Sequence, residues 1–231
     1  MPVITLTGRT ASGAREVGPR IASLLGIDFV DQQLMVQAAQ RCGVPVDVVA
    51  ERDERYGSFR QRVAAVINTI LERSAASGAD PLAGPGSLEA VLSRSYAEVG
   101  IEEEEKDFSD QTYLETVSAI ISELAASGRI VILGRGSQMI LADLPRALHV
   151  LTVAPKELRY ERFAEREGIE ADEAKRRVEE NDRGRAAFYK KFWKVDVQDP
   201  CLYDLTVDTS HFSLDQAAEL IATAVRVKAG D

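Results

Sequence analysis

The start of the chain limits its fold most strongly, because a strand, a glycine-containing turn and a helix are predicted there in immediate succession. Residues 3–7 (VITLT) form a short apolar and β-branched run, the pattern of a buried strand. The turn GRTASG follows over residues 8–13, and Val17, Ile21 and Leu24 then recur at helical spacing. Such a turn presents backbone N–H groups and a helix N-terminus to an anion. The unit therefore predicts a phosphate site, with an ordinary strand-to-helix turn as the alternative.

The turn is similar to the phosphate-binding pattern G-x-x-x-x-G-K-[ST], although two positions differ. Gly8 and Gly13 lie five residues apart, as the two glycines of that pattern do. Ala14 stands where the pattern has its phosphate-binding Lys, and Arg15 stands where it has the magnesium-binding hydroxyl. We therefore expect Arg15, with Arg9 on the same turn, to supply positive charge to the phosphates.

Strand-like and helical patterns alternate along the rest of the chain. Further strands are predicted over residues 27–30, 130–133, 149–153 and 202–208. Helical stripes are predicted over residues 113–127, after Pro155, over 172–193 and over 214–225. This order predicts the α/β class, as a three-layer α/β/α architecture with a five-stranded, mostly parallel sheet. We expect one domain over residues 1–231, with a helical insertion at 32–108 and a second helical elaboration at 155–200.

Charge and residue usage exclude several classes of function. A formal net charge of −9 argues against a nucleic-acid partner, because binding one needs a broad basic surface. Cys42 and Cys201 lack metal-ligand spacing and only two histidines are present, so no zinc site is expected. No apolar run is long enough to cross a membrane, and no secretory signal is visible. We therefore expect a cytoplasmic protein, whose acidic balance still allows a small phosphorylated ligand.

Charged residues follow two predicted strands and gather in the second elaboration. Asp31 ends the strand at 27–30, where it can meet a ligand in the sheet's crevice or cap the next helix. Arg135, between two glycines after residues 130–133, can reach a phosphate at the same edge or lie in a tight surface turn. The excess of cations near Asp182 points to an anionic ligand, with a solvated helix face as the alternative. The cations of this segment are Arg159, Arg162, Arg166, Arg183, Arg185, Lys190, Lys191 and Lys194.

Six segments together resemble the cytidylate kinase-like family, in the same order along the chain. They are GRTASGAREVG, DFVDQQLMVQAA, VILGRGSQMIL, HVLTVAPKELRYERFAERE, NDRGRAAFYKKFW and DPCLYDLTVDTSHFSLDQAAELI. The resemblance covers nearly all of the chain outside residues 45–108. It implies the fold of P-loop nucleoside monophosphate kinases, with a five-stranded parallel core. Residues 32–108 would then be the monophosphate-binding insertion, and residues 155–200 would form a mobile lid.

The resemblance also implies an activity, the ATP-dependent and magnesium-dependent phosphorylation of a nucleoside monophosphate, with CMP or dCMP as the first expected acceptor. The residues expected to bind ATP are Gly8, Arg9, Thr10, Ala11, Ser12, Gly13, Ala14, Arg15 and Glu16, and Ser12 would meet the magnesium ion. The expected catalytic residues are Arg15, Arg135, Asp182 and Arg185. The expected substrate-binding residues are Asp31, Gln37, Arg135, Arg159, Arg162, Arg183 and Arg185.

The chain also departs from true cytidylate kinases outside the glycine turn. Gln37 stands where an acceptor-binding arginine is expected, and Gly136 replaces an aspartate after Arg135. Three functions therefore stay open: a nucleoside monophosphate kinase, a nucleotide-binding protein without kinase activity, and a kinase with a non-nucleotide acceptor. The sequence leaves the oligomeric state open as well.

Overall fold

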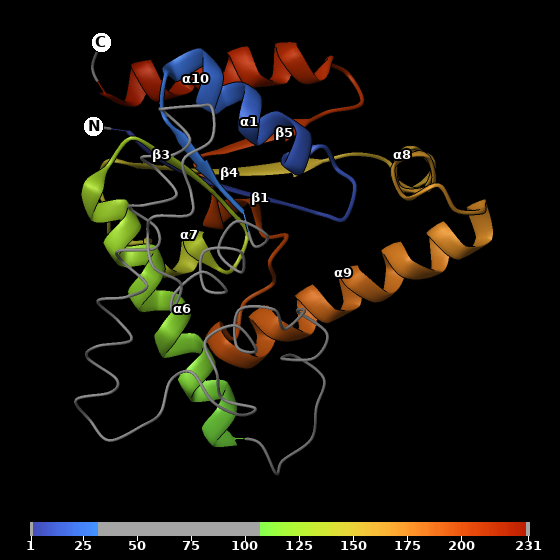
Figure 1. Ribbon diagram of the computed structural model, residues 1–231, viewed down its shortest axis with the longest axis horizontal. Helices are drawn as coiled ribbons and strands as arrows, with labels where there is room; N and C mark the ends of the chain where they lie inside the picture. The colour runs from blue at the N-terminus through green and yellow to red at the C-terminus, as the bar shows by residue number, and fades with distance from the viewer. Residues whose placement is uncertain (1, 32–106, 230–231) are drawn as a thin grey trace, which may run out of the picture.

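Strand β1, Val3–Gly8, lies at the centre of a five-stranded parallel sheet (Figure 1). The structure is a computed structural model that describes residues 2–31 and 107–229. The strand order is β2-β3-β1-β4-β5. The other strands are Asp28–Val30 (β2), Ile130–Leu133 (β3), Ala147–Val153 (β4) and Leu205–Asp208 (β5). Because every neighbouring pair is parallel, all five carboxyl ends lie at one edge of the sheet.

The pairing of β1 on both sides fixes where its loop emerges. Val3 is paired with Ile130 of β3 and with Ala147 of β4. Leu6 is paired with Leu133, the last residue of β3. The loop after β1 and the turn after β3 therefore leave the sheet side by side, at the edge where open α/β sheets bind their ligands.

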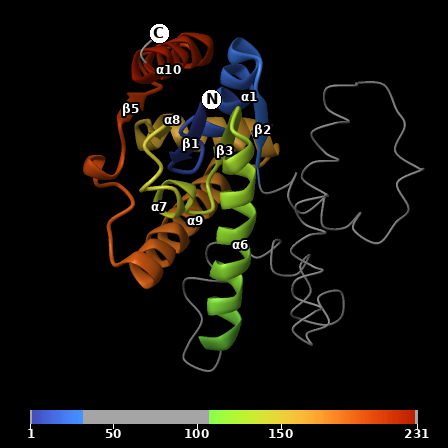
Figure 2. The ribbon, with the colours of Figure 1, turned by 90° about the vertical axis from the view of Figure 1, so that its left-hand side faces the viewer.

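Helices cover both faces of the sheet, so the predicted three-layer α/β/α architecture is confirmed (Figures 1 and 2). One face carries α1 (Ala14–Leu25) and α10 (Leu214–Ala229), and the other carries α6 (Asp107–Ser127) and the short α7 (Ser137–Ile140). After β4, α8 (Lys156–Glu167) and α9 (Ala171–Trp193) pack against each other as a hairpin. None of the described helices combines the length and the apolar character needed to span a membrane.

Side chains of β1 alternate between two apolar clusters. Ile4 and Leu6 are fully buried on the side of α1 and α10, in a cluster with Val17, Ile21, Val131, Val150 and Ile221. Val3 faces the other side, in a cluster with Tyr113, Val117, Ile120, Phe188 and Tyr189. The second cluster shows that the C-terminal part of α9 packs on the same face of the sheet as α6.

Most predicted elements are confirmed, with differences at their ends. Strand β4 begins earlier than predicted, at Ala147, and β5 begins later, at Leu205. The late start of β5 has a local cause, because the Pro200–Leu202 segment forms a 3₁₀-helix with Asp199 as its N-cap. Leu24, which is part of the apolar pattern of the first predicted helix, lies on that helix but is 43% exposed. The predicted insertion lies outside the described residues, apart from the start of α6.

A buried histidine joins β4 to β1 and β5. His149 is 9% exposed, and its Nδ1 lies 2.8 Å from the hydroxyl of Thr5. Its backbone N–H donates to the carboxylate of Asp204 at 2.8 Å, and Lys228 donates to the same oxygen. Burial lowers the pKa of His149 below its ordinary value of 6.5, although the Asp204 carboxylate opposes the shift. The folded chain therefore favours the neutral ring.

We predict that acid destabilises the fold through His149. Because its folded pKa lies below its unfolded pKa, the unfolded chain binds the proton more readily. The stability contributed by the neutral ring is present above pH 6.5 and is lost as the pH falls through the folded pKa. Urea unfolding at about pH 8 and about pH 5.5 should therefore show a smaller acid-induced loss of unfolding free energy for His149→Gln than for wild type.

The matched control is His211→Gln, because the His211 side chain is 77% exposed. This variant should keep the pH dependence of the wild type. An equally steep loss of stability in His149→Gln would contradict the prediction.

Candidate functional site

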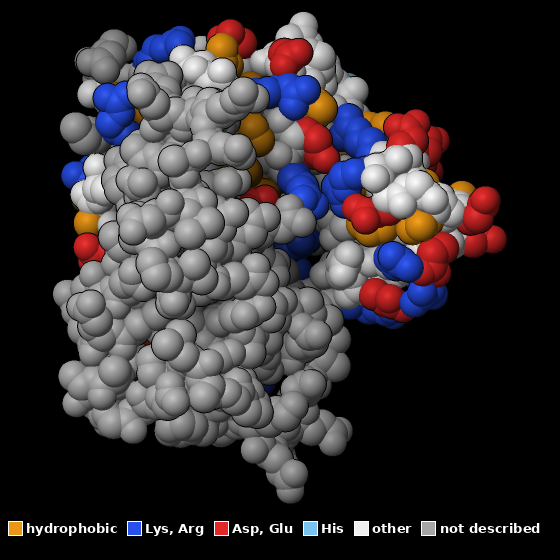
Figure 3. Space-filling view, viewed as in Figure 1, with side chains coloured by type: hydrophobic (Ala, Val, Ile, Leu, Met, Phe, Trp, Pro, Cys, Tyr) orange, Lys and Arg blue, Asp and Glu red, His pale blue; other side chains and the backbone are white. Residues whose placement is uncertain are grey.

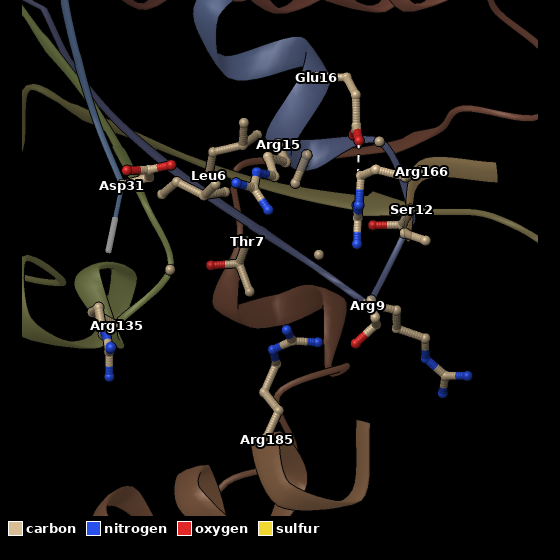
Figure 4. Close-up of a pocket in the computed structure, with 17 residues that line it drawn as sticks. Leu6, Thr7, Arg9, Ser12, Arg15, Glu16, Asp31, Arg135, Arg166 and Arg185 are labelled. Atoms are coloured by element: carbon tan, nitrogen blue, oxygen red, sulfur yellow. Dashed lines mark hydrogen bonds and ion pairs between the residues drawn. The ribbon is translucent and has the colours of Figure 1, made fainter. Parts of the chain in front are cut away.

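A pocket of about 440 Å³ lies at the carboxyl edge of the sheet (Figure 4). Its wall comes from the loop after β1, the start of α1, the end of β2, the turn after β3, and helices α8 and α9. This volume is typical of sites for small molecules. The predicted site residues that line it are Gly8, Arg9, Thr10, Ala11, Ser12, Gly13, Ala14, Arg15, Glu16, Asp31, Arg135 and Arg185.

Glycine is required at the start of the loop because other side chains fill the space beside it. A Cβ at Gly8 would lie 2.2 Å from Thr152 Oγ1 and 2.3 Å from Ser12 Oγ. These two hydroxyls are hydrogen-bonded to each other at 2.7 Å. The Ser12 hydroxyl, predicted to meet magnesium, is thus engaged with β4 inside the protein. The hydroxyl oxygen could bind magnesium only through a lone pair that this hydrogen bond leaves available, and the role of Ser12 stays a prediction.

The start of α1 offers backbone N–H groups to the pocket. Its N-cap, Gly13, has φ +91°, and among the described residues no side chain caps the helix. The first N–H groups of a helix have no partner within the helix, and the helix dipole makes this end favourable for anions. Ala14 is only 8% exposed and belongs to the core, whereas Arg15 is exposed at the pocket. Arg15 therefore brings a cation to this part of the pocket wall, and its role at the phosphates stays a prediction.

Positive charge dominates the wall of the pocket. Five guanidinium groups line it, against the two carboxylates of Glu16 and Asp31. The arginines are Arg9, Arg15, Arg135, Arg166 and Arg185. Figure 3 shows Lys and Arg side chains gathered at the hollow beside α8, in a chain of net charge −9. In Figure 4, the guanidinium groups of Arg15 and Arg185 are directed toward each other from α1 and α9.

Arg135 is held in a left-handed turn at the end of β3. Gly134, Arg135 and Gly136 have φ values of +73°, +59° and +71° in succession. Arg135 is 2% exposed, and its Nη1 donates to the hydroxyl of Tyr113 at 2.6 Å. Next to it, a Cβ at Gly136 would lie 2.3 Å from the ring of Trp193. Gly136, where the family resemblance leads us to expect an aspartate, is therefore packed against an indole.

Arg166 lines the pocket, although the sequence placed it only among the cations of residues 155–200 and not among the expected site residues. It comes from the last turn of α8, and its Nη1 lies 3.3 Å from the carboxylate of Glu16. Its guanidinium also lies over the ring of Phe163, 5.1 Å from the centroid. The available signal was its spacing, because Arg166 follows Arg162 by one helical turn.

Four predicted residues do not line the pocket, and a fifth lies outside the described residues. Arg162 donates to the hydroxyl and the carbonyl oxygen of Thr209, at 2.8 and 3.0 Å. Arg183 is exposed on α9. Arg159 and Asp182 are paired with each other at 2.7 Å, behind the loop. Gln37 is the residue outside the described ranges, and the roles of all five stay predictions.

The two carboxylates of the pocket wall are suited to a magnesium ion that is bound mainly by substrate phosphates. Residues 2–31 and 107–229 contain no group of three or more His, Cys, Asp or Glu side chains that could hold a metal. Magnesium in proteins is usually held by one or two carboxylates together with waters and substrate phosphates. Glu16 and Asp31 are the two carboxylates of the pocket wall that could take this role.

The amino-acid sequence is similar to one protein family and to proteins that carry the name of that family's enzyme. The sequence model of the cytidylate kinase-like family matches residues 3–211. A cytidylate kinase from Methanopyrus kandleri is 36% identical over 112 residues, which are 45% of this chain and 58% of that protein. A cytidylate kinase from Pyrobaculum calidifontis is 28% identical over 165 residues, which are 71% of this chain and 85% of that protein. The chain therefore matches little more than half the length of the Methanopyrus protein.

A solved structure shares the fold. The crystal structure of an uncharacterized protein from Eubacterium ventriosum covers 97% of this chain, and 98% of its own chain is covered in return. The TM-score is 0.60 at 14% sequence identity. This likeness supports the α/β architecture described above.

We predict that Gly136→Ala is more destabilising than a left-handed glycine alone explains. Gly26 has a similar φ of +62° and nothing within 4 Å of an added Cβ, so Gly26→Ala measures the backbone cost, about 1 kcal/mol. Gly136→Ala adds a clash with Trp193, which contacts Phe188, Tyr189 and Phe192. It should cost about 1–3 kcal/mol more in urea unfolding. Equal losses of unfolding free energy in the two variants would contradict the prediction, because they would show that the Trp193 ring moves aside without cost.

Proposed function

The chain belongs to the cytidylate kinase-like family, and from this membership we propose that it transfers the terminal phosphoryl group of ATP to a small phosphorylated acceptor. The first acceptor to consider is a nucleoside monophosphate, CMP or dCMP, since curated relatives carry the name cytidylate kinase. The proposal places the reaction in the cytoplasm and requires neither a nucleic-acid polymer nor a membrane.

The observation that carries the proposal is the gathering of five guanidinium groups against two carboxylates in one pocket. Two phosphorylated reactants bring several negative charges together, and phosphoryl transfer depends mainly on positioning and on charge stabilisation. Arginine suits this task, because its planar fork donates two parallel hydrogen bonds to phosphate oxygens.

The donor phosphates are assigned to the loop after β1 and the start of α1. The N–H groups at the start of α1 would bind phosphate oxygens, and Arg15 would supply the charge that a Lys supplies in the usual pattern. Arg185 is directed toward Arg15 across the pocket (Figure 4). It would therefore meet the transferring phosphoryl group, where charge is redistributed in the transition state.

The acceptor is assigned to the ends of β2 and β3. Arg135 would bind its phosphate, and the hydrogen bond from Arg135 to Tyr113 at 2.6 Å already fixes the guanidinium. Such preorganisation lowers the reorganisation needed on binding. A carboxylate of the pocket wall, Asp31 or Glu16, would contact the magnesium ion, which when bound neutralises phosphate charge. Arg166 would add a cation on the donor side, near Glu16.

A nucleotide-binding protein without kinase activity is the second candidate. It is favoured by two features of the loop: Ala14 brings no amine, and the Ser12 hydroxyl is engaged by Thr152. A kinase with a non-nucleotide acceptor is a third candidate, since Gly136 lacks the carboxylate expected in a cytidylate kinase. Release of ADP that depends on a nucleoside monophosphate separates the first candidate from the other two.

We predict acceptor-dependent release of ADP that requires Arg15. The assay uses ATP and magnesium with CMP, dCMP, UMP, AMP or GMP in turn. Arg15→Ala should abolish release, because it removes the loop's cation at the phosphates. Arg20→Ala is the matched control on α1, since Arg20 lies outside the pocket and pairs with Asp215. ATP binding without ADP release for any acceptor would favour the non-catalytic protein, or a kinase whose acceptor was not screened.

We further predict that Arg185→Ala lowers turnover by more than about a hundredfold, because a cation that acts in the transition state is lost. Arg176→Ala should leave turnover unchanged, since Arg176 lies on the same helix but is 56% exposed and pairs with Glu173 and Glu180. Steady-state kinetics at saturating ATP would test both. Near-wild-type turnover in Arg185→Ala would remove Arg185 from the reaction.

A further inference from the structure

We propose that Arg159 is a positioning residue for the phosphate loop, although it does not line the pocket. Together with Asp182 it holds the loop, residues 8–13, against the α8–α9 hairpin. The affinity of the pocket for ATP then depends on an ion pair that ATP does not touch. The part of this inference that concerns ATP rests on the proposed function.

Arg159 is buried at a junction of three segments. It is 1% exposed and is among the largest fully buried side chains of the described residues. Its Nη1 donates to the carbonyl oxygen of Thr10 at 3.0 Å and to Oδ2 of Asp182 at 2.7 Å. One nitrogen therefore joins α8 to both the loop and α9.

Asp182 contacts the same loop residue, Thr10, from α9. Its Oδ1 accepts a hydrogen bond from the backbone N–H of Thr10 at 2.9 Å. The carbonyl and the N–H of Thr10 are thus both held, one by Arg159 and the other by Asp182. Two hydrogen bonds to the same loop residue fix its peptide planes, which a single contact would not do.

An apolar contact supports the next residue of the loop. Ala11 packs against the cluster of Phe163, Ala174 and Val178, which lies between α8 and α9. Its φ is +60°, a conformation that residues with a Cβ rarely adopt. The α8–α9 hairpin therefore stabilises an unfavourable backbone conformation inside the proposed phosphate site.

Asp182 also links this ion pair to the pocket. Arg185 Nη1 lies 3.4 Å from Oδ1 of Asp182, and Arg185 lines the pocket. The Asp182 carboxylate therefore lies between the buried guanidinium of Arg159 and a guanidinium of the pocket wall. A buried ion pair is weak evidence for stability, but it is suited to fixing a geometry. The roles differ from those predicted from the sequence, where Arg159 binds substrate and Asp182 is catalytic.

The test measures ATP affinity and loop opening in Arg159→Met and Asp182→Asn. Calorimetry with ATP and magnesium should show affinity weakened by about tenfold or more in either variant, because the loop's N–H groups lose their alignment. Amide hydrogen exchange at Thr10, without nucleotide, should be faster by about tenfold or more. Arg159→Lys should recover part of both effects, since an ammonium can still pair with Asp182.

Arg177→Met is the matched control, because Arg177 lies on α9 and pairs with Glu173 at the surface, 49% exposed. It should leave ATP affinity and loop exchange as in the wild type. The proposal is overturned if a folded Arg159→Met or Asp182→Asn variant keeps both wild-type values. Asp182→Asn keeps the shape of the side chain, so it decides the matter if Arg159→Met does not fold. Absence of ATP binding in the wild type would reject the proposed function, while exchange at Thr10 would still test the loop contact.

Discussion

The two-sided pairing of β1 is the constraint on which the site depends. A strand that is paired with β3 over residues 3–6 and with β4 over residues 3–8 cannot slide or tilt, so the residue after Gly8 leaves the sheet at a fixed point. The same register places the end of β3 beside it, and with it the turn that carries Arg135. The loop, the first turn of α1 and Arg135 are therefore brought together by backbone pairing alone, before any side chain of the pocket makes a contact.

Electrostatics then determines how the side chains are supported. Guanidinium groups at this density repel one another, and several arginines at or beside the pocket have partners within the protein. Arg135 donates to Tyr113, Arg159 pairs with Asp182, and Arg166 lies near Glu16. These partners come from α6, α9 and α1, so three helices share the task of holding cations at one edge of the sheet. An anionic ligand would relieve the remaining repulsion, and binding and stability are expected to be linked.

The regular spacing of apolar residues predicted the fold. It could not predict which partners individual polar side chains contact. The buried stripe of α6 and the apolar strands β1 and β3 follow from spacing that the structure confirms. Arg159, Arg162 and Arg166 show the limit. They share one face of α8, so sequence reasoning grouped them, yet they contact Thr10, Thr209 and Glu16 respectively. Only tertiary packing decides which neighbour each position meets. Ser12 is a similar case, because its hydroxyl turns to Thr152, whose proximity depends on how β4 pairs with β1.

The exclusive use of arginine in the described wall of the pocket has a chemical consequence. A guanidinium is not an amine, so acetylation and the other acyl transfers that silence lysines have no target among Arg9, Arg15, Arg135, Arg166 and Arg185. The usual pattern has one such target, the Lys that binds the phosphates, and this chain has Ala14 at that position. Acetyl donors therefore cannot neutralise the cations of this described wall. Dicarbonyl compounds, which react with guanidinium groups, are the reagents that could.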